Sequence, residues 1–276
     1  QISEDILFQN NDLKIGIHSN KNKAEPQYNL VFYRNKTKEP MITFSLNVDK
    51  EKENEEIKKD DKKSKIFIFG SNGMLGNYMC SVLSKKYTVI GLTRNDYDLS
   101  NLEIDTLESL LKEKQLEQGD IVINCAGVIP QASKQQELNT NLYFKVNSLF
   151  PVILNMLCNK LEAKMITITT DCVFDGKLGG YREDSKHTET NEYGVSKSLG
   201  ELCGAMMIRT SIIGEEKTNK RSLLEWVRSN SGNKINGYTK HFWNGVTCLE
   251  LAKVVLEVIE KEKFWKGVRH IYSPTS

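Results

Sequence analysis

The stretch that decides the fold is residues 65–76, which read Lys65-Ile66-Phe67-Ile68-Phe69-Gly70-Ser71-Asn72-Gly73-Met74-Leu75-Gly76. A short, continuous apolar run that leads into glycines is typical of a buried strand in a parallel sheet. The glycines Gly70, Gly73 and Gly76 recur at every third position. With this spacing a backbone turn can approach a pyrophosphate at the N-terminus of a following helix. The stretch therefore predicts a strand, a phosphate-binding turn and a helix.

Strand-like and helix-like segments alternate through the rest of the chain. Further apolar runs occur at residues 88–92, 120–125, 164–170 and 206–210, and segments with helical spacing, such as 107–111 and 146–158, lie between them. Short apolar strands separated by helices favour a parallel sheet that is covered on both faces. We therefore predict an α/β protein with a Rossmann-type, doubly wound parallel sheet.

The residues before this pattern have a different character. Residues 49–64 are dense in charges of both signs and almost devoid of apolar side chains, which predicts a linker. Strand patterns at 28–33 and 41–48 make residues 1–48 a β-rich segment, expected to be the tail of a larger domain. Residues 65–276 form the predicted dinucleotide-binding domain, with a substrate-binding part after about residue 211 and an incomplete C-terminus.

Composition excludes several classes of function. The 276 residues are 39% hydrophobic and 27% charged, with a formal net charge of +2, so nothing predicts binding to nucleic acid or to a membrane surface. No apolar run reaches the length of about 18 residues that a membrane helix needs. The six cysteines are scattered without a Cys-x-x-Cys pair, which predicts a reducing, cytoplasmic setting and no metal site.

Tyr193 and Lys197 form the most informative pair of side chains. They are four residues apart, so on a helix they share one face. An ammonium beside a phenol favours the phenolate and lowers the phenol's pKa. We therefore predict that Tyr193 exchanges a proton during a reaction near neutral pH.

Two further strand ends carry residues suited to a dinucleotide. The second strand ends at Thr93-Arg94, and an arginine there suits the 2′-phosphate of NADP, although Asp96 and Asp98 follow nearby and would suit NAD. The third strand ends in small residues that leave room for the cofactor's ribose and phosphates, namely Cys125, Ala126 and Gly127. We predict NADP, with NAD as the alternative.

Thr170 ends the fourth strand. A hydroxyl at the carboxyl end of a parallel strand faces the crevice in which ligands bind, so Thr170 can donate a hydrogen bond to a substrate carbonyl. Tyr193 would then protonate the carbonyl oxygen while a nicotinamide delivers hydride to the carbon.

Together these motifs resemble a known family. Gly70-x-x-Gly73-x-x-Gly76, Asn124-Cys-Ala-Gly127, Thr169-Thr170-Asp171-x-Val173-Phe174-x-Gly176, Tyr193-x-x-x-Lys197 and Arg209-Thr210-Ser211 are similar to those of the extended short-chain dehydrogenase/reductase superfamily. Within it, the chain from about Lys65 most resembles the dTDP-4-dehydrorhamnose reductase family. The resemblance implies an enzyme that uses NADPH to reduce the 4-keto group of a nucleotide-linked 4-keto-6-deoxyhexose.

The resemblance also implies roles for individual residues. Catalysis falls to Thr170, Tyr193 and Lys197. The residues that would bind the cofactor are Gly70, Asn72, Gly73, Met74, Leu75, Gly76, Thr93, Arg94, Cys125, Ala126, Gly127, Tyr193 and Lys197. The residues that would bind the nucleotide sugar are Val128, Asp171, Arg209, Lys240 and Trp243. A homodimer is left open.

Cys172 departs from the reductase pattern, in which a tyrosine usually occupies its position. In epimerase/reductases of the GDP-fucose synthase type a cysteine lies there, and a thiol can move the acidic proton beside a ketone. Cys172 therefore adds 3- or 5-epimerisation as a second expectation. The partner acid on the opposite face would be one of Lys217, Lys220, His187 and His241.

Two other functions fit the same scaffold. A dehydratase or epimerase with tightly bound NAD usually needs an Asp-Glu pair after the threonine, but Asp171-Cys172 follows Thr170 here. A non-catalytic regulatory subunit would have no chemical need for both Tyr193 and Lys197. The sequence therefore favours the reductase over both alternatives.

Overall fold

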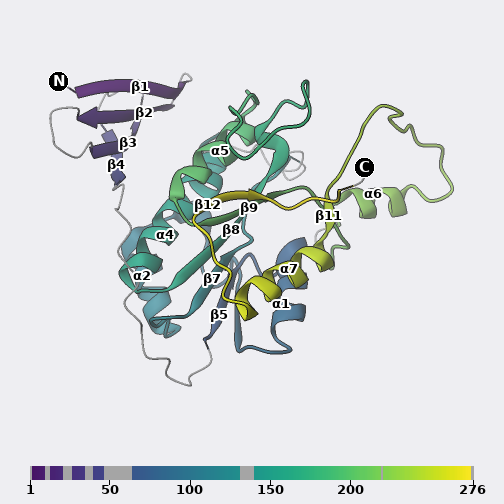
Figure 1. Cartoon of the computed structure of the whole chain (residues 1–276), viewed down its shortest axis with the longest axis horizontal. Coiled ribbons are helices and arrows are strands. Elements are labelled where there is room, and N and C mark those ends of the chain that lie inside the picture. The colour runs from purple at the N-terminus through teal and green to yellow at the C-terminus, as the bar shows by residue number, and fades with distance from the viewer. Residues whose placement is uncertain are drawn as a thin grey trace. The chain divides into compact units, whose positions relative to one another are not determined.

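A computed structural model gives the fold of the chain and describes residues 2–9, 13–20, 27–34, 40–46, 64–130, 140–218 and 220–274. The chain divides into two compact units, Gln1–Asp61 and Lys62–Ser276 (Figure 1). The predicted linker at 49–64 lies outside the described residues, except for Ser64.

The first unit is a four-stranded antiparallel sheet in which each strand pairs with the next along the chain. Its strands are β1 (Ile2–Gln9), β2 (Leu13–Asn20), β3 (Gln27–Arg34) and β4 (Pro40–Leu46). The strand patterns at 28–33 and 41–48 correspond to β3 and β4, whereas β1 and β2 were not predicted.

The second unit is built on a six-stranded sheet with the order β12-β9-β8-β7-β5-β6, and every pair in it is parallel. The strands are β5 (Ile66–Phe69), β6 (Val89–Leu92), β7 (Ile121–Asn124), β8 (Lys164–Thr170), β9 (Met206–Thr210) and β12 (Gly267–His270). This arrangement confirms the predicted Rossmann-type parallel sheet.

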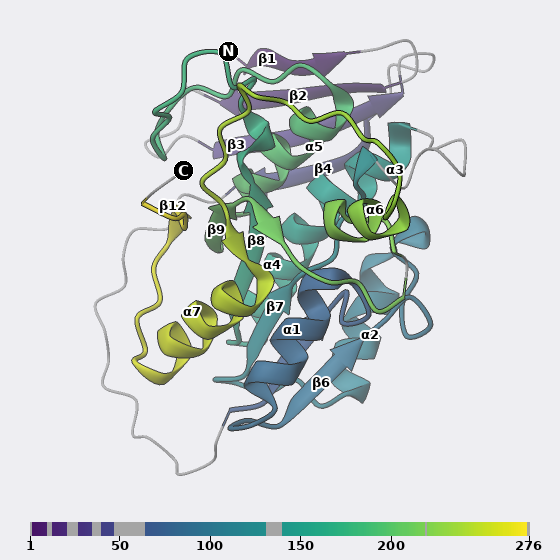
Figure 2. The same ribbon diagram turned by 90° about the vertical axis from the view of Figure 1, so that its right-hand side faces the viewer.

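Helices cover both faces of this sheet (Figures 1 and 2). One face carries α1 (Met74–Leu83) and α7 (Cys248–Glu260), which pack on each other and on the buried side chains of Ile66 and Ile68. On the other face, the Phe150 ring meets Phe69 edge-on at 5.1 Å. The helices of that face are α2 (Ile104–Glu113), α4 (Phe150–Lys160) and α5 (Glu192–Gly200). Alternate residues of β5 thus serve two cores, which is why its sequence is apolar at every position.

The strand order places a crevice beside β5. From β5 the chain adds β6 on one side and then returns to add β7 on the other side. At such a switch point the connections leave in opposite directions, and ligands bind beyond the carboxyl ends of the strands. Gly70, Asn124 and Cys125 lie at this edge.

Shorter elements complete the second unit. They are η1 (Leu99–Asn101), α3 (Thr140–Phe144), the π-helix η3 (Lys145–Leu149), η4 (Asp171–Val173), η5 (Glu201–Cys203), β10 (Ile212–Ile213), α6 (Leu223–Ser229) and β11 (Val246–Thr247). β10 and β11 pair in parallel outside the main sheet. Among the described residues, no helix is both long and apolar enough to cross a bilayer.

Candidate active site

The glycine turn is closely packed and requires its glycines. Gly70 has a positive φ of 75°, and a Cβ there would lie 2.8 Å from the backbone nitrogen of Ala126. The Gly73 N–H donates to the Gly70 carbonyl at 2.9 Å, and α1 begins at the next residue, Met74. A Cβ on Gly76 would lie only 2.1 Å from the Gly70 oxygen. The turn therefore lies directly against the first turn of α1.

This geometry suits a pyrophosphate. The first N–H groups of a helix have no partner within the helix and lie at its positive end. Leu75 turns its side chain into the core and Asn72 is exposed, so backbone groups dominate the inner surface of the turn. Sequence reasoning did not single out Ser71, whose buried hydroxyl donates to the Leu92 carbonyl at 3.1 Å and ties the turn to β6.

The end of β6 presents an exposed arginine and two engaged carboxylates. Asp96 Oδ2 accepts hydrogen bonds from the backbone N–H and the hydroxyl of Thr93, both at 2.8 Å, and these bonds lower the pKa of Asp96. Asp98 accepts from the Ser100 N–H at 2.9 Å and caps η1. Arg94, by contrast, is exposed. The loop's own hydrogen bonds thus occupy the acidic groups that would suit NAD.

Thr170, Cys172 and Tyr193 come together where β8 ends and α5 begins. The Thr170 hydroxyl accepts the Cys172 N–H at 3.2 Å, and Thr170 also acts on the pKa of Tyr193. Asn191 caps α5 by accepting the Gly194 N–H at 2.8 Å. A Cβ on Gly194 would lie 2.6 Å from the Cys172 carbonyl oxygen, so glycine allows α5 to pack on this loop.

The pKa of Tyr193 departs from the expected direction. Burial raises it well above the usual range, and the Cys172 thiol adds to the rise, whereas the hydrogen bond with Thr170 lowers it. Desolvation penalises the phenolate more than neighbouring groups favour it. The expectation that Lys197 lowers this pKa was therefore wrong for the chain by itself. Tyr193 holds its proton throughout the neutral range, as a proton donor must.

Lys197 lies beside the loop that follows β7. A Cβ on Gly127 would be 2.7 Å from the Lys197 Nζ, so this glycine leaves room for the ammonium. Burial lowers the pKa of Lys197 to about 8, and the carboxylate of Glu201 opposes that shift. The structure therefore joins Lys197 of α5 to the strand end formed by Cys125, Ala126 and Gly127.

Asn147 holds α5 against the loop that follows β7. Its buried side chain accepts the Val128 N–H at 2.9 Å and donates to the Val128 carbonyl and the Ser196 hydroxyl, both at 3.0 Å. Because Ser196 precedes Lys197, the amide fixes α5 against the loop after β7. Asn147 lies in the π-helix η3, a kind of distortion that often accompanies functional sites.

A small cavity of about 10 Å³ lies beneath Lys197. Its walls include Asn124, Asn147 and Thr167, and the Thr167 hydroxyl has no hydrogen-bond partner among the described residues. An unpartnered buried hydroxyl contributes nothing favourable to folding.

We expect Thr167→Val to leave the free energy of unfolding unchanged or raised by up to about 1 kcal/mol, because only the unpartnered hydroxyl is lost. Urea unfolding measures the change. Thr169→Val is the matched control. It removes a hydroxyl that donates to Glu201 Oε1 at 2.9 Å, and should cost about 1.5–3 kcal/mol. If both variants lost the same free energy of unfolding, the Thr167 hydroxyl would not be unpartnered.

Cys172 follows Thr170 by two residues, and its Sγ lies 3.7 Å from Asp171 Oδ1. Desolvation of the thiol raises its pKa, and the Asp171 carboxylate adds to that rise. A thiol with a raised pKa is a poor base at neutral pH. Of the proposed partner acids, His187 is held elsewhere, by Ser198 at 2.5 Å and Arg209 at 2.9 Å.

Arg209 is buried and paired with other side chains, so its substrate-binding role stays a prediction that the structure does not support. Its side chain is only 2% exposed and forms an ion pair with Glu201, with 2.5 Å between Nη2 and Oε2. A buried guanidinium needs such partners to compensate for its lost hydration, and they hold it inside the protein.

The other predicted substrate residues are spread along the chain. Val128 is buried with Tyr143 and Val146, whereas Asp171 is exposed next to Thr170. Lys240 and Trp243 lie on the connection between α6 and β11, where Trp243 Nε1 donates to the Ser211 hydroxyl at 2.8 Å. No group of three or more potential metal ligands occurs among the described residues.

Comparison with known proteins gives a consistent result. The family model described as RmlD substrate binding domain matches residues 64–273. A probable low-salt glycan biosynthesis reductase of Haloferax volcanii is 26% identical over 212 residues, which cover 70% of each chain. A dTDP-4-dehydrorhamnose reductase of Mycobacterium tuberculosis is 27% identical over 143 residues, or 50% of this chain and 44% of that protein.

Solved structures share the fold. The dTDP-4-dehydrorhamnose reductase of Bacillus anthracis, determined in complex with NADP, superposes with a TM-score of 0.65 at 22% identity. That match covers 78% of this chain and 76% of the other chain.

Proposed function

Because this chain belongs to the RmlD substrate binding domain family, we propose that it is an NADPH-dependent reductase of a nucleotide-linked 4-keto-6-deoxyhexose. The observation that supports the proposal is that Tyr193 and Lys197 lie one turn apart on α5, that Thr170 acts on the pKa of Tyr193, and that Gly127 leaves room for the Lys197 Nζ. Relatives named dTDP-4-dehydrorhamnose reductase support the choice of a 4-keto sugar. Which nucleotide the sugar carries is a finer question for experiment.

Each of the three residues has a distinct role in the proposal. Tyr193, whose pKa is raised by burial, donates its proton to the ketone oxygen. Thr170 hydrogen-bonds the same oxygen and orients it. Lys197 has a pKa of about 8 and is therefore largely cationic at neutral pH. Its positive charge stabilises the phenolate that remains on Tyr193 after the proton has been transferred.

NADPH supplies the hydride when it is bound. The turn at Gly70, Gly73 and Gly76 suits the pyrophosphate of NADPH. Glycines allow the turn to pack closely against the N-terminus of α1, where backbone N–H groups can bind an anion. Arg94 would pair with the 2′-phosphate, and the engagement of Asp96 and Asp98 within their own loop favours NADP over NAD.

Arg94→Ala should raise the KM for NADPH about tenfold and leave that for NADH nearly unchanged, because a charge-assisted bond to one phosphate is lost. Steady-state kinetics with both cofactors measures the ratio. Lys85→Ala is a matched control, since it removes an exposed cation on the connection that leads into β6. Equal effects of Arg94→Ala on both cofactors would contradict the role of Arg94.

The proposed function is tested by incubating the full chain with dTDP- and UDP-linked 4-keto-6-deoxy sugars and NADPH or NADH. We expect oxidation of NADPH and a 4-hydroxy product identified by NMR. In deuterated water, incorporation of solvent deuterium at C3 or C5 would reveal epimerisation. The raised pKa of Cys172 does not favour it, so a product labelled at neither carbon is expected. No turnover of any 4-keto sugar would reject the reductase.

A further inference from the structure

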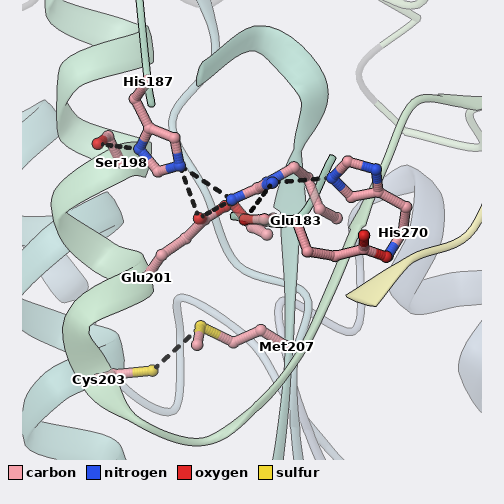
Figure 3. A network of polar contacts seen from close by, with 9 residues as sticks. Glu183, His187, Ser198, Glu201, Cys203, Met207 and His270 are labelled. Atoms are coloured by element: carbon pink, nitrogen blue, oxygen red, sulfur yellow. Dashed lines mark hydrogen bonds and ion pairs between the residues drawn. The ribbon is translucent and has the colours of Figure 1, made fainter. Parts of the chain in front are cut away.

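A network of polar and charged side chains has a buried ion pair at its centre (Figure 3). Glu201 and Arg209 form its centre, and His187 and His270 contact the guanidinium at 2.9 and 2.8 Å. Glu183 closes the network by accepting the His270 backbone N–H at 2.9 Å. These residues come from five places in the chain, and the proposed roles of Thr170, Tyr193 and Lys197 do not account for them.

Two parallel hydrogen bonds join the Arg209 guanidinium to the Glu201 carboxylate. Arg209 Nε donates to Glu201 Oε1 at 3.1 Å, and Nη2 donates to Oε2 at 2.5 Å. Such a two-pronged contact fixes the orientation of the carboxylate as well as its position. Both side chains are almost completely buried, so neither charge is screened by water.

Glu201 connects this pair to the reacting groups in two ways. It begins η5, which continues α5 directly, and follows Lys197 by four residues, or about one helical turn. Its Oε1 also accepts the Thr169 hydroxyl at 2.9 Å, and Thr169 immediately precedes Thr170 on β8. One carboxylate thus ties the helix of Tyr193 and Lys197 to the strand of Thr170.

We propose that Glu201 is a positioning residue, which holds α5 against the end of β8 and places its negative charge one helical turn from Lys197. Arg209 acts through Glu201 by fixing its carboxylate. The part of this proposal that concerns catalysis depends on the proposed reductase function. The coupling between Glu201 and Lys197, however, can be measured without turnover.

The charges around Lys197 agree with this role. Burial lowers the pKa of Lys197, and the groups that oppose the shift are Glu201, Cys172 and Cys125. Both cysteines are themselves neutral at pH 7, because desolvation raises their pKa values. Burial alone would also raise the pKa of Glu201, but its contacts with His187 and Arg209 outweigh that effect and hold the pKa below its usual range. Glu201 is therefore the ionised partner of Lys197 at neutral pH.

The test is competitive labelling of Lys197 in the full chain with a trace of acetic anhydride across pH, read by mass spectrometry of its peptide. The midpoint of labelling reports the pKa of the amine. Glu201→Gln should move the midpoint down by roughly one pH unit, as expected for loss of a nearby opposite charge. The alkaline limb of kcat/KM should move in the same direction.

Glu183→Gln is the matched control, because it changes another carboxylate of the same network that does not act on Lys197. Its labelling midpoint should equal that of the wild type. A folded Glu201→Gln with an unchanged midpoint would overturn the proposal.

If Glu201→Gln does not fold, Glu201→Asp decides the matter. Glu201→Asp keeps the negative charge, but its shorter side chain no longer reaches the Thr169 hydroxyl. We therefore expect kcat to fall, while the labelling midpoint of Lys197 moves by less than one pH unit. A wild-type kcat together with a wild-type midpoint would overturn the proposal. A shifted midpoint in a chain that reduces no ketosugar would instead support the coupling and reject the proposed function.

Discussion

Tyr193→Phe should lower kcat about 10²–10⁴-fold, because it removes the proton donor and keeps the ring. The ring is packed against Tyr143, with 6.3 Å between ring centroids, and phenylalanine preserves that contact. The KM for NADPH should change far less than kcat. Stopped-flow measurement of NADPH oxidation in a single turnover separates this chemical step from product release.

Tyr181→Phe is the matched control for this variant. The Tyr181 hydroxyl donates to Asp175 Oδ1 at 3.0 Å in the loop after η4, away from Thr170 and Lys197. Its removal should reduce stability slightly and leave kcat near that of the wild type. If Tyr193→Phe also kept a near wild-type kcat with intact folding, Tyr193 would not be the proton donor, and the assignment of the site would fail.

The sequence was most informative about backbone geometry. The apolar run before Gly70 predicted β5, and the spacing to Gly76 predicted a turn in which the structure leaves no room for a Cβ at Gly70 or Gly76. Strand patterns at 164–170 and 206–210 coincide with β8 and β9. These features are local, so a few neighbouring residues are enough to specify them.

The sequence did not reveal burial and long-range pairing. The family resemblance implied that Arg209 binds substrate, but its side chain is buried against Glu201 and His270, which lie eight and 61 residues away in sequence. The direction of the Tyr193 pKa depended on how deeply α5 packs, which helical spacing does not reveal. The bracing by Asn147 depends on Val128 and Ser196, which lie 19 and 49 residues away in sequence.

The Trp243 and Lys240 region shows the same limitation. The family resemblance implied that Lys240 and Trp243 bind the nucleotide sugar, and aromatic side chains near them are exposed, including Tyr238 and Phe242. Exposure alone does not assign a partner to them. Their role in substrate recognition therefore stays a prediction, unlike the parallel sheet, which the structure confirms.

Gly76→Ala should abolish most cofactor binding, even though alanine is the better helix former by about 1 kcal/mol. The added Cβ would lie 2.1 Å from the Gly70 carbonyl oxygen, well inside contact distance, and 2.8 Å from Cα of Ser71. Neither neighbour is a movable side chain. The helix cannot retreat easily, because Leu75 and Met79 anchor α1 in the core against the sheet.

The turn must therefore move away from α1, which separates the backbone donors that would hold a pyrophosphate. We expect at least a tenfold loss of NADPH affinity by fluorescence titration, and destabilisation of about 1–3 kcal/mol from overpacking. Ser81→Ala is the matched control, since it introduces the same residue at an exposed position of α1 and should change neither quantity appreciably. Unchanged NADPH affinity in a folded Gly76→Ala protein would mean that the cofactor does not bind at this turn.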